Sequence, residues 1–297
     1  MKKAKVFFTK EITSPSLLNM YKVLEKQLPG KVAVKVHSGE KGNQNYLHPK
    51  FLKELIDYVN GTVVECNTAY PGERDTTEKH QKLMTEHEWT KYFEVDIMDD
   101  EGPDLEIEIP KGIKIKKNYL GKNIKKYDSM LIISHFKGHP MGGYGGALKQ
   151  LSIGCASSYG KRYIHCVGKN NGTYEDMFKV KQDEFLESMA DSASSVHNLF
   201  SNNIVYINIL CNMSVDCDCC ANAAAPCMND IGILSSTDPI ALDQACIDLI
   251  YTSKDKGRDK LIKRIESRNG TYLIDVASKL NFGTKEYELI NVEKEGD

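Results

Sequence analysis

The sequence predicts an α/β fold, a mostly parallel sheet flanked by helices. Short apolar runs of the kind that form strands alternate with amphipathic segments of helical period along most of the chain. This alternation is typical of β-α-β units and a parallel sheet. At 297 residues the chain can form one large domain, residues 1–297, or two lobes that divide it into residues 1–128 and 129–297.

The alternation is clearest in the first part of the chain. Three strand-like runs are each followed by a segment of helical character. The pairs are Ala4–Thr9 with Ser16–Gln27, Val32–His37 with Pro49–Val59, and Val63–Asn67 with Thr76–Lys91. A fourth strand is expected at Val95–Met98. The segment Lys111–Lys126 alternates Ile with Lys and is expected to be an exposed two-stranded or edge element, where lysines block unwanted pairing.

In the second part, the apolar run Ser129–Ile133 predicts a buried strand. The long amphipathic segment Glu175–Phe200 predicts a helix over part of its length. A further helix is expected to begin at Asp238 and Pro239, because Asp is a favoured cap and Pro is favoured at the first helical position. Three more strands are expected, at Val205–Leu210, Gly232–Ser236 and Tyr287–Val292.

The composition is that of a soluble globular protein, with 41% hydrophobic and 27% charged residues. A net charge of −2 argues against general binding of nucleic acid. No apolar run reaches the ~20 residues that span a bilayer, and the N-terminus is expected to form a strand and not a signal peptide. These features predict a cytoplasmic protein. In that reducing compartment the nine cysteines are expected to be core residues, ligands or catalytic thiols.

The most informative segment is Ser134–Gly154, which contains two His, two Lys and six Gly directly after a predicted buried strand. The carboxyl ends of strands are where open α/β sheets bind ligands. His135, Lys137 and His139 alternate, so their side chains share one face if the strand continues. We therefore expect an active-site loop, with these side chains as catalytic candidates.

Lys149 follows the glycines, on a predicted first helical turn at Ala147–Leu151. Free N–H groups and the helix dipole favour an anion there, so a small carboxylate or phosphate compound is the expected ligand and Lys149 a fourth catalytic candidate. Glycine amides of the loop are expected to help bind it. A nucleotide cofactor is not indicated, because neither common phosphate-binding motif is present.

Five cysteines fall within seventeen residues, in the segment CNMSVDCDCCANAAAPC that begins at Cys211. Thiolates favour zinc or iron–sulfur centres, and this density predicts a transition-metal site. The spacing matches neither a ferredoxin run nor a zinc ribbon, so the type of centre stays open. The candidate ligands are Cys217, Cys219, Cys220 and Cys227.

The loop NTAYPGER, from Asn67 to Arg74, follows another predicted strand. Arg74 is a candidate for binding a ligand carboxylate, since its planar guanidinium can donate two parallel hydrogen bonds. His80 and His87 share one face of the next predicted helix, but about 10 Å separates them, which is too far for joint ligation of one ion. His87 is expected to be a surface or packing residue.

Three separated motifs together resemble one known family. They are NTAYPGER with the two histidines downstream, SHFKGHPMGGYGGALKQLSIGCASSYGK, and CDCC followed by NDIGILSSTDPIALDQACIDLI. In this order they resemble the DUF362 family, whose members are often labelled uncharacterised iron–sulfur center proteins. The resemblance runs from about Lys35 to Ile250 and implies where the site is, without implying a reaction. Longer members carry a ferredoxin-like insert that this chain lacks.

The resemblance adds detail to the glycine loop. The family usually has Asn after the loop lysine, whereas this chain has Gln150, which keeps the amide. The expected substrate-binding set is then Arg74, Gly142, Gly143, Gly145, Gly146 and Gln150.

Three functions are compatible with these features. The favoured one is a metal- or iron–sulfur-dependent enzyme that acts on a small anionic substrate by His/Lys acid–base chemistry at the glycine loop. The alternatives are a non-catalytic metal or iron–sulfur protein and a protein that binds a small anion without turnover. The enzyme is favoured because paired His and Lys beside a glycine loop are unnecessary for a metal carrier.

Overall fold

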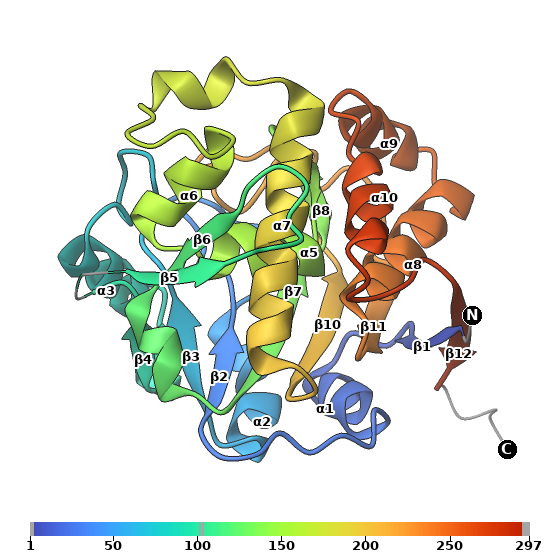
Figure 1. The fold of residues 1–297 in the computed structure, drawn as a ribbon. Helices are drawn as coiled ribbons and strands as arrows, with labels where there is room; N and C mark the ends of the chain where they lie inside the picture. The colour runs from blue at the N-terminus through green and yellow to red at the C-terminus, as the bar shows by residue number, and fades with distance from the viewer. Residues whose placement is uncertain (1–2, 101, 103, 293–297) are drawn as a thin grey trace, which may run out of the picture.

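The computed structural model describes residues 3–100, 102 and 104–292. Its centre is an eight-stranded sheet that runs through the molecule (Figure 1). In spatial order the strands are β12 (Tyr287–Asn291), β1 (Ala4–Thr9), β11 (Gly232–Ser236), β10 (Ile204–Leu210), β7 (Ser129–His135), β2 (Val32–Lys35), β3 (Gly61–Glu65) and β4 (Val95–Ile97). Neighbouring strands are parallel except where β11 pairs with β1 and β10. The predicted fold class is confirmed.

Helices cover both faces of the sheet (Figure 1). One face packs against α1 (Ser14–Lys22), α2 (Pro49–Tyr58), α3 (Thr77–Glu86) and α4 (Trp89–Tyr92). The other packs against α5 (Ala147–Lys149), α6 (Ser158–His165), α7 (Gln182–Phe200), α8 (Pro239–Thr252), α9 (Arg258–Glu266) and α10 (Tyr272–Lys279). Strand β7 shows why both faces need cover: Met130 and Ile132 enter one core, and Leu131 and Ile133 the other, as the period of two requires.

Two predicted elements differ in the structure. The helix expected over Thr76–Lys91 is broken at Glu88, whose φ of 61° is in the left-handed region. The break lets the Trp89 side chain become fully buried and donate its indole N–H to the Ser38 carbonyl at 3.2 Å. A tertiary contact thus overrides the helical pattern.

The two-stranded ribbon expected within Lys111–Lys126 is present, but only one of its strands lies in that segment. Strand β5 (Leu105–Glu108) pairs with β6 (Lys117–Leu120), so half of the ribbon precedes the lysine-rich segment. Between them the buried Asp191 carboxylate accepts the backbone N–H groups of residues 113–115 at 2.6–2.8 Å. This tight turn ends the Ile/Lys alternation and buries Ile115.

The sheet includes strands from both sides of residue 128, since β2 pairs with β7 and β1 pairs with β11. The division into domains remains a prediction. Among the described residues, no helix has both the length and the apolar character that crossing a membrane requires.

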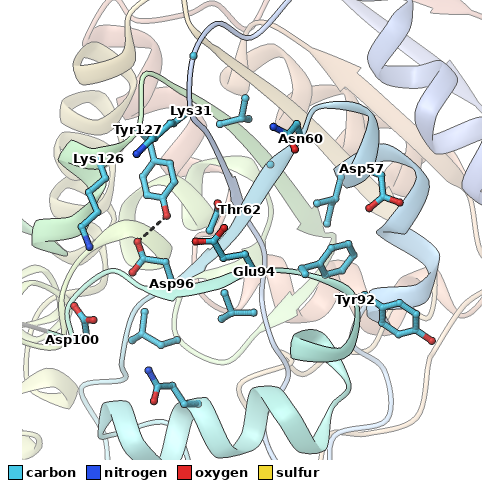
Figure 2. Close-up of a pocket in the computed structure, with 18 residues that line it drawn as sticks. Lys31, Asp57, Asn60, Thr62, Tyr92, Glu94, Asp96, Asp100, Lys126 and Tyr127 are labelled. Atoms are coloured by element: carbon cyan, nitrogen blue, oxygen red, sulfur yellow. Dashed lines mark hydrogen bonds between the residues drawn. The ribbon is translucent and has the colours of Figure 1, made fainter.

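The two edges of the parallel strands differ. The carboxyl ends of β2, β3, β7 and β10 meet at one edge, as predicted from the residues that follow them: the His135 Nε2 lies 2.6 Å from the Cys211 carbonyl oxygen. At the opposite, amino edge, a cavity of about 640 Å³ opens between the starts of β2, β3 and β4 (Figure 2).

Candidate metal and anion site

The glycine loop and the cysteine loop meet at a buried carboxylate, Asp218. The His135 Nδ1 lies 2.9 Å and the Lys137 Nζ 2.7 Å from its oxygens. Since the other nitrogen of His135 faces the Cys211 carbonyl, both ring nitrogens donate and the ring is cationic. Burial alone would raise the pKa of Asp218, but these two cations lower it. Burial would lower the pKa of Lys137, and Asp218 raises it.

Glycine is required where the two loops approach each other. The short strands β8 (Lys137–His139) and β9 (Gly143–Gly145) form a hairpin, and the amide of Gly138 donates to the Ser214 carbonyl at 2.8 Å. A Cβ at Gly138 would lie 2.3 Å from the Val215 carbonyl oxygen. Only a residue without a side chain lets the hairpin lie against the cysteine loop.

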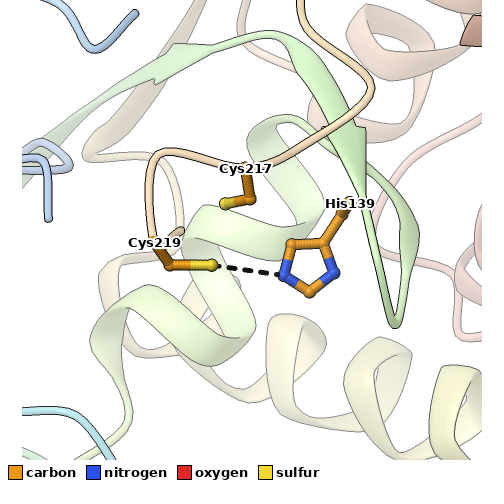
Figure 3. A group of neighbouring side chains, drawn as sticks. All are labelled: His139, Cys217 and Cys219. Atoms are coloured by element: carbon orange, nitrogen blue, oxygen red, sulfur yellow. Dashed lines mark hydrogen bonds between the residues drawn. The ribbon is translucent and has the colours of Figure 1, made fainter. Parts of the chain in front are cut away.

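This contact brings His139 together with Cys217 and Cys219 (Figure 3). Their donor atoms all lie within 4.8 Å of one another, and the His139 Nε2 is 3.9 Å from the Cys219 Sγ. Asp218 lies between the two cysteines in the sequence, so its ion pairs fix the position of both. Within the described part of the chain, these three residues form the group that can hold a metal ion.

The structure does not bring the other two candidate cysteines into this group. The Cys227 Sγ lies 3.3 Å from the Met213 carbonyl oxygen, and neither it nor Cys220 belongs to the three-residue set. Cys220 lies next to this group, and its contact with Cys219 lowers the pKa of the Cys220 thiol. The four cysteines were predicted to act together because they are close in the sequence, but the path of the loop leaves only Cys217 and Cys219 in the donor group.

The pKa values of the Cys217 and Cys219 thiols shift in opposite directions. The Cys219 thiol donates to Cys217, and this contact, together with Lys149, Lys137 and His139, lowers the pKa of Cys217 well below its ordinary value in spite of burial. The same contact and burial raise the pKa of Cys219. The Lys149 Nζ lies 3.9 Å from the Cys217 Sγ. The arrangement therefore stabilises one thiolate beside a lysine.

A cavity of about 310 Å³ opens beside this group. Its wall includes His139 and Cys219 of the donor group. It also includes four cationic side chains, two other imidazoles and one carboxylate, and the rest of the wall is largely apolar. The charged and imidazole residues are Lys35, Arg74, Lys149, Lys161, His37, His165 and Glu65.

Two of these cations are neutralised by the chain's own carboxylates. The Lys35 Nζ lies 2.5 Å from Glu65. Arg74 contacts Glu40 at 3.2 Å and Glu65 at 3.8 Å. Burial would lower the pKa of Arg74, but Tyr70, Glu40 and Glu65 raise it. Arg74 binds carboxylates, as its residue type suggested, but these carboxylates belong to the protein's own Glu40 and Glu65 and not to a ligand. Its role toward a ligand remains a prediction.

Lys149 and Lys161 have no carboxylate partner among the described residues. The Lys161 Nζ donates to the Ala156 carbonyl at 2.6 Å, and burial lowers its pKa. Both lysines line the cavity. They are the cations that remain available to an anion.

The glycine amides lie elsewhere. None of Gly142, Gly143, Gly145 and Gly146 is in the cavity wall that the described residues form. Gly143 packs against Gly270, and Gly145 leaves room for the stems of Lys137 and Lys149, each 3.5–3.6 Å from a hypothetical Cβ. Gln150 lines the cavity, but its side-chain amide donates to the Ile133 carbonyl at 3.3 Å.

The expected anion site at the start of helix α5 is filled by the protein itself. The Asp243 carboxylate accepts the N–H groups of Ala147 and Leu148 at 2.8 and 3.0 Å. Asn208 donates to the same carboxylate at 2.7 Å. The expectation of a ligand anion at this helix end was wrong, because a distant aspartate supplies the charge.

Sequence reasoning missed His37, Lys161 and His165, which all line the cavity. His37 follows β2 at the carboxyl edge, and this position was a usable signal. Lys161 and His165 lie on α6, which was not predicted; Lys161 is the last residue of the second motif that resembles the DUF362 family, and this was a usable signal, whereas His165 lies beyond the motif. His80 and His87 instead contact Ser38, outside the cavity wall.

A model of a domain of unknown function, DUF362, matches residues 32–248. The chain belongs to this family. No functionally curated protein matches the sequence.

Two solved structures are similar in fold. One is the lactate racemase apoprotein from Thermoanaerobacterium thermosaccharolyticum, with a TM-score of 0.48 and 13% identity, over 83% of this chain and 57% of that one. The other is a structural-genomics protein from Thermotoga maritima, with a TM-score of 0.44 and 10% identity, over 92% of this chain and 60% of that one. The present chain thus spans less than two thirds of either neighbour.

Proposed function

We propose that this chain is an enzyme that acts on a small organic anion beside a transition-metal ion held by His139, Cys217 and Cys219. One observation carries the proposal: this donor group opens onto a cavity whose wall holds two lysines, Lys149 and Lys161, without carboxylate partners in the described residues. A metal carrier does not need such a cavity.

The donor set fits a single ion better than a cluster. Two thiols and one imidazole suit zinc or a single iron, and three protein ligands leave a position open, as in catalytic zinc sites. Iron–sulfur clusters are generally held by four cysteines, which the described residues do not bring together here. A bound ion would supply Lewis acidity toward a carbonyl or phosphoryl oxygen.

Lys149, His37 and His165 would have different roles in the reaction. Lys149 would bind the anion and stabilise charge that develops on it. His37 accepts the Gly39 N–H at Nδ1, so its Nε2 carries the proton and can donate. His165 donates from Nδ1 to the Lys161 carbonyl at 2.7 Å, so its Nε2 can accept. Both imidazoles are neutral, because burial lowers the pKa of His37 and lowers that of His165 to about 3.

The sequence suggested that His135 and Lys137 are catalytic, but we propose a positioning role for both. Both are occupied by Asp218 and neither is in the cavity wall described here. The proposal therefore treats them as positioning residues for the cysteine loop. All nine cysteines are unpaired, which supports the proposal that the protein works in the reducing cytoplasm.

Metal analysis tests the metal-centre proposal. Protein prepared without oxygen should contain zinc or iron in a constant ratio to chain, and the double variant Cys217→Ser, Cys219→Ser should lose it. Cys227→Ser is the matched control, because its thiol lies outside the donor group, and it should keep the metal. Full metal content in the double variant would refute the metal centre.

A second candidate is a thiol enzyme without metal. The His139 Nδ1 lies 3.1 and 2.9 Å from the amide nitrogens of Met141 and Gly142, so it accepts, and without a metal Nε2–H points to the thiols; a metal ion at Nε2 would have to replace that proton. Such an imidazole stabilises a thiolate nucleophile. Metal-free protein would then be alkylated by iodoacetamide at the Cys217–Cys219 pair, which is reached through Cys219 in the cavity wall, at neutral pH, and Lys149→Met would slow the reaction.

A further inference from the structure

The cavity has a buried charged floor and an exposed apolar mouth. At the floor Lys161 is 7% exposed and Lys35 is completely buried. At the mouth Tyr174 and Phe178 are 43% and 60% exposed, with their rings in edge contact at 5.2 Å. A ligand that fills the cavity therefore meets a cation at one end and aromatic rings at the other.

Lys161 is incompletely paired at this floor. An ammonium has three donors, and in the described residues one donates to the Ala156 carbonyl. The nearby carboxylate Glu65 is already occupied by Lys35 and by the Ser38 amide at 2.9 Å. A buried cation with free donors is costly unless an anion reaches it.

The wall between floor and mouth is apolar. Met141, Ile153 and Met177 line it, and Met177 is 3% exposed. Inorganic phosphate or acetate would leave this surface in contact with water. Thioether and aliphatic side chains instead suit the hydrocarbon part of an organic ligand.

We propose that the substrate is an amphipathic organic anion: its carboxylate or phosphate group binds Lys161 and Lys149, and its hydrocarbon body lies along Met141, Ile153 and Met177 toward Phe178. This inference rests on the proposed function and names its substrate class. It assigns Lys161 to headgroup binding and Phe178 to the far end of the hydrocarbon body.

Calorimetric titration of the full chain with a series of carboxylates tests this. Acetate, butyrate and hexanoate should bind with increasing affinity, by about fourfold for each added methylene that is buried. Hexanamide, which has the same chain without the charge, should bind at least about tenfold more weakly than hexanoate. Hexyl phosphate beside hexanoate shows which headgroup the site prefers.

Two pairs of variants locate the ends of the ligand. Lys161→Met should lower hexanoate affinity by about tenfold, whereas Lys161→Arg, which keeps the charge, should restore most of it. Phe178→Ser should flatten the increase with chain length and leave acetate binding unchanged. Tyr58→Ser is its control, because Tyr58 is similarly exposed, at 56%, and lies outside this cavity wall.

The outcomes separate this inference from the proposed function. Equal affinity for acetate and hexanoate, or unchanged hexanoate binding in Lys161→Met, would overturn the inference, while metal content and acetate binding could still support the metal-dependent enzyme. Conversely, affinity that increases with chain length in a chain that holds no metal would overturn the metal centre and keep the substrate class.

Discussion

The amino and carboxyl edges of the parallel strands both carry cavities lined by charged residues, and the larger one is at the amino edge. That cavity, of about 640 Å³, is lined by Lys31, Asp57, Glu94, Asp96 and Lys126 among others (Figure 2). The cavity at the carboxyl edge is about 310 Å³. Volume alone would therefore select the amino edge.

Two carboxylates at the amino edge, Asp96 and Asp57, have partners close by. Asp96 accepts the Tyr127 hydroxyl at 2.7 Å (Figure 2) and the Asn123 amide at 2.8 Å. Asp57 pairs with Lys53 one helical turn away. These groups are half-buried or exposed, so water can complete their hydrogen bonds.

At the carboxyl edge most charged groups are buried, Lys149 being half-buried, and two lysines, Lys149 and Lys161, lack a carboxylate in the described structure. Burial without neutralisation costs free energy, which a ligand can recover. Buried, incompletely paired charge therefore marks this site better than cavity volume does. The site lies at this edge because the loops that follow parallel strands converge at the strands' carboxyl ends.

The sharpest test of this contrast is a pair of Asp-to-Asn variants. Asp218→Asn leaves the buried cations His135 and Lys137 without a counter-charge and should lower the free energy of unfolding by about 3 kcal/mol or more. Asp96→Asn at the amino edge should cost about 1 kcal/mol. Chemical denaturation measures both. Equal losses would contradict the difference in burial on which the comparison depends.

Acid should destabilise the carboxyl edge through His80. Burial lowers the pKa of His80 to about 3, whereas an unfolded histidine has a pKa of about 6.5. Below about pH 6.5 the unfolded state binds the proton and the folded state does not, so stability is lost as pH falls. At about pH 5 the loss approaches 2 kcal/mol.

Denaturation curves between about pH 7.5 and pH 5, compared with His80→Gln, measure this share of the pH dependence. The variant should lose less stability on acidification than the unmodified chain. His48→Gln removes an exposed histidine and serves as the control. Parallel pH profiles for all three proteins would refute a neutral, buried His80.

The smallest expected effect concerns anion binding at each edge. Lys149→Met removes a cation beside the thiols and should weaken acetate or phosphate binding by about tenfold with little change in stability. Lys126→Met removes an exposed lysine from the amino-edge cavity and should change nothing. If the two variants weaken binding equally, the anion is attracted by general charge and not by the carboxyl-edge site.

Most elements of the fold follow from local patterns. Strands β1 and β11 occupy the predicted residues, and α8 begins as predicted, with Asp238 accepting the amides of Ile240 and Ala241. Helix α6 was not predicted, although residues Ser158–His165 are amphipathic and the Ser157 hydroxyl caps the start of the helix by accepting the Gly160 N–H. The break at Glu88 was missed because the burial of Trp89, a tertiary contact, decides it.

The sequence by itself determined the chemistry that was available: a glycine loop with His and Lys after a buried strand, and a cysteine-rich loop after another. Strand polarity then required both loops to lie at one edge of the sheet, since parallel strands share the direction of their carboxyl ends.

Only the tertiary structure decided which of these groups act together. The donor group contains Cys217 and Cys219 but not Cys227. Asp243 occupies the helix end where a ligand was expected. Arg74 is neutralised by Glu40, whereas Lys161 has no carboxylate partner in the described residues. These outcomes depend on contacts between residues far apart in the chain, such as Asp218 with Lys137. Local patterns cannot encode them, because the free energy of a buried charge depends on which distant charge lies beside it.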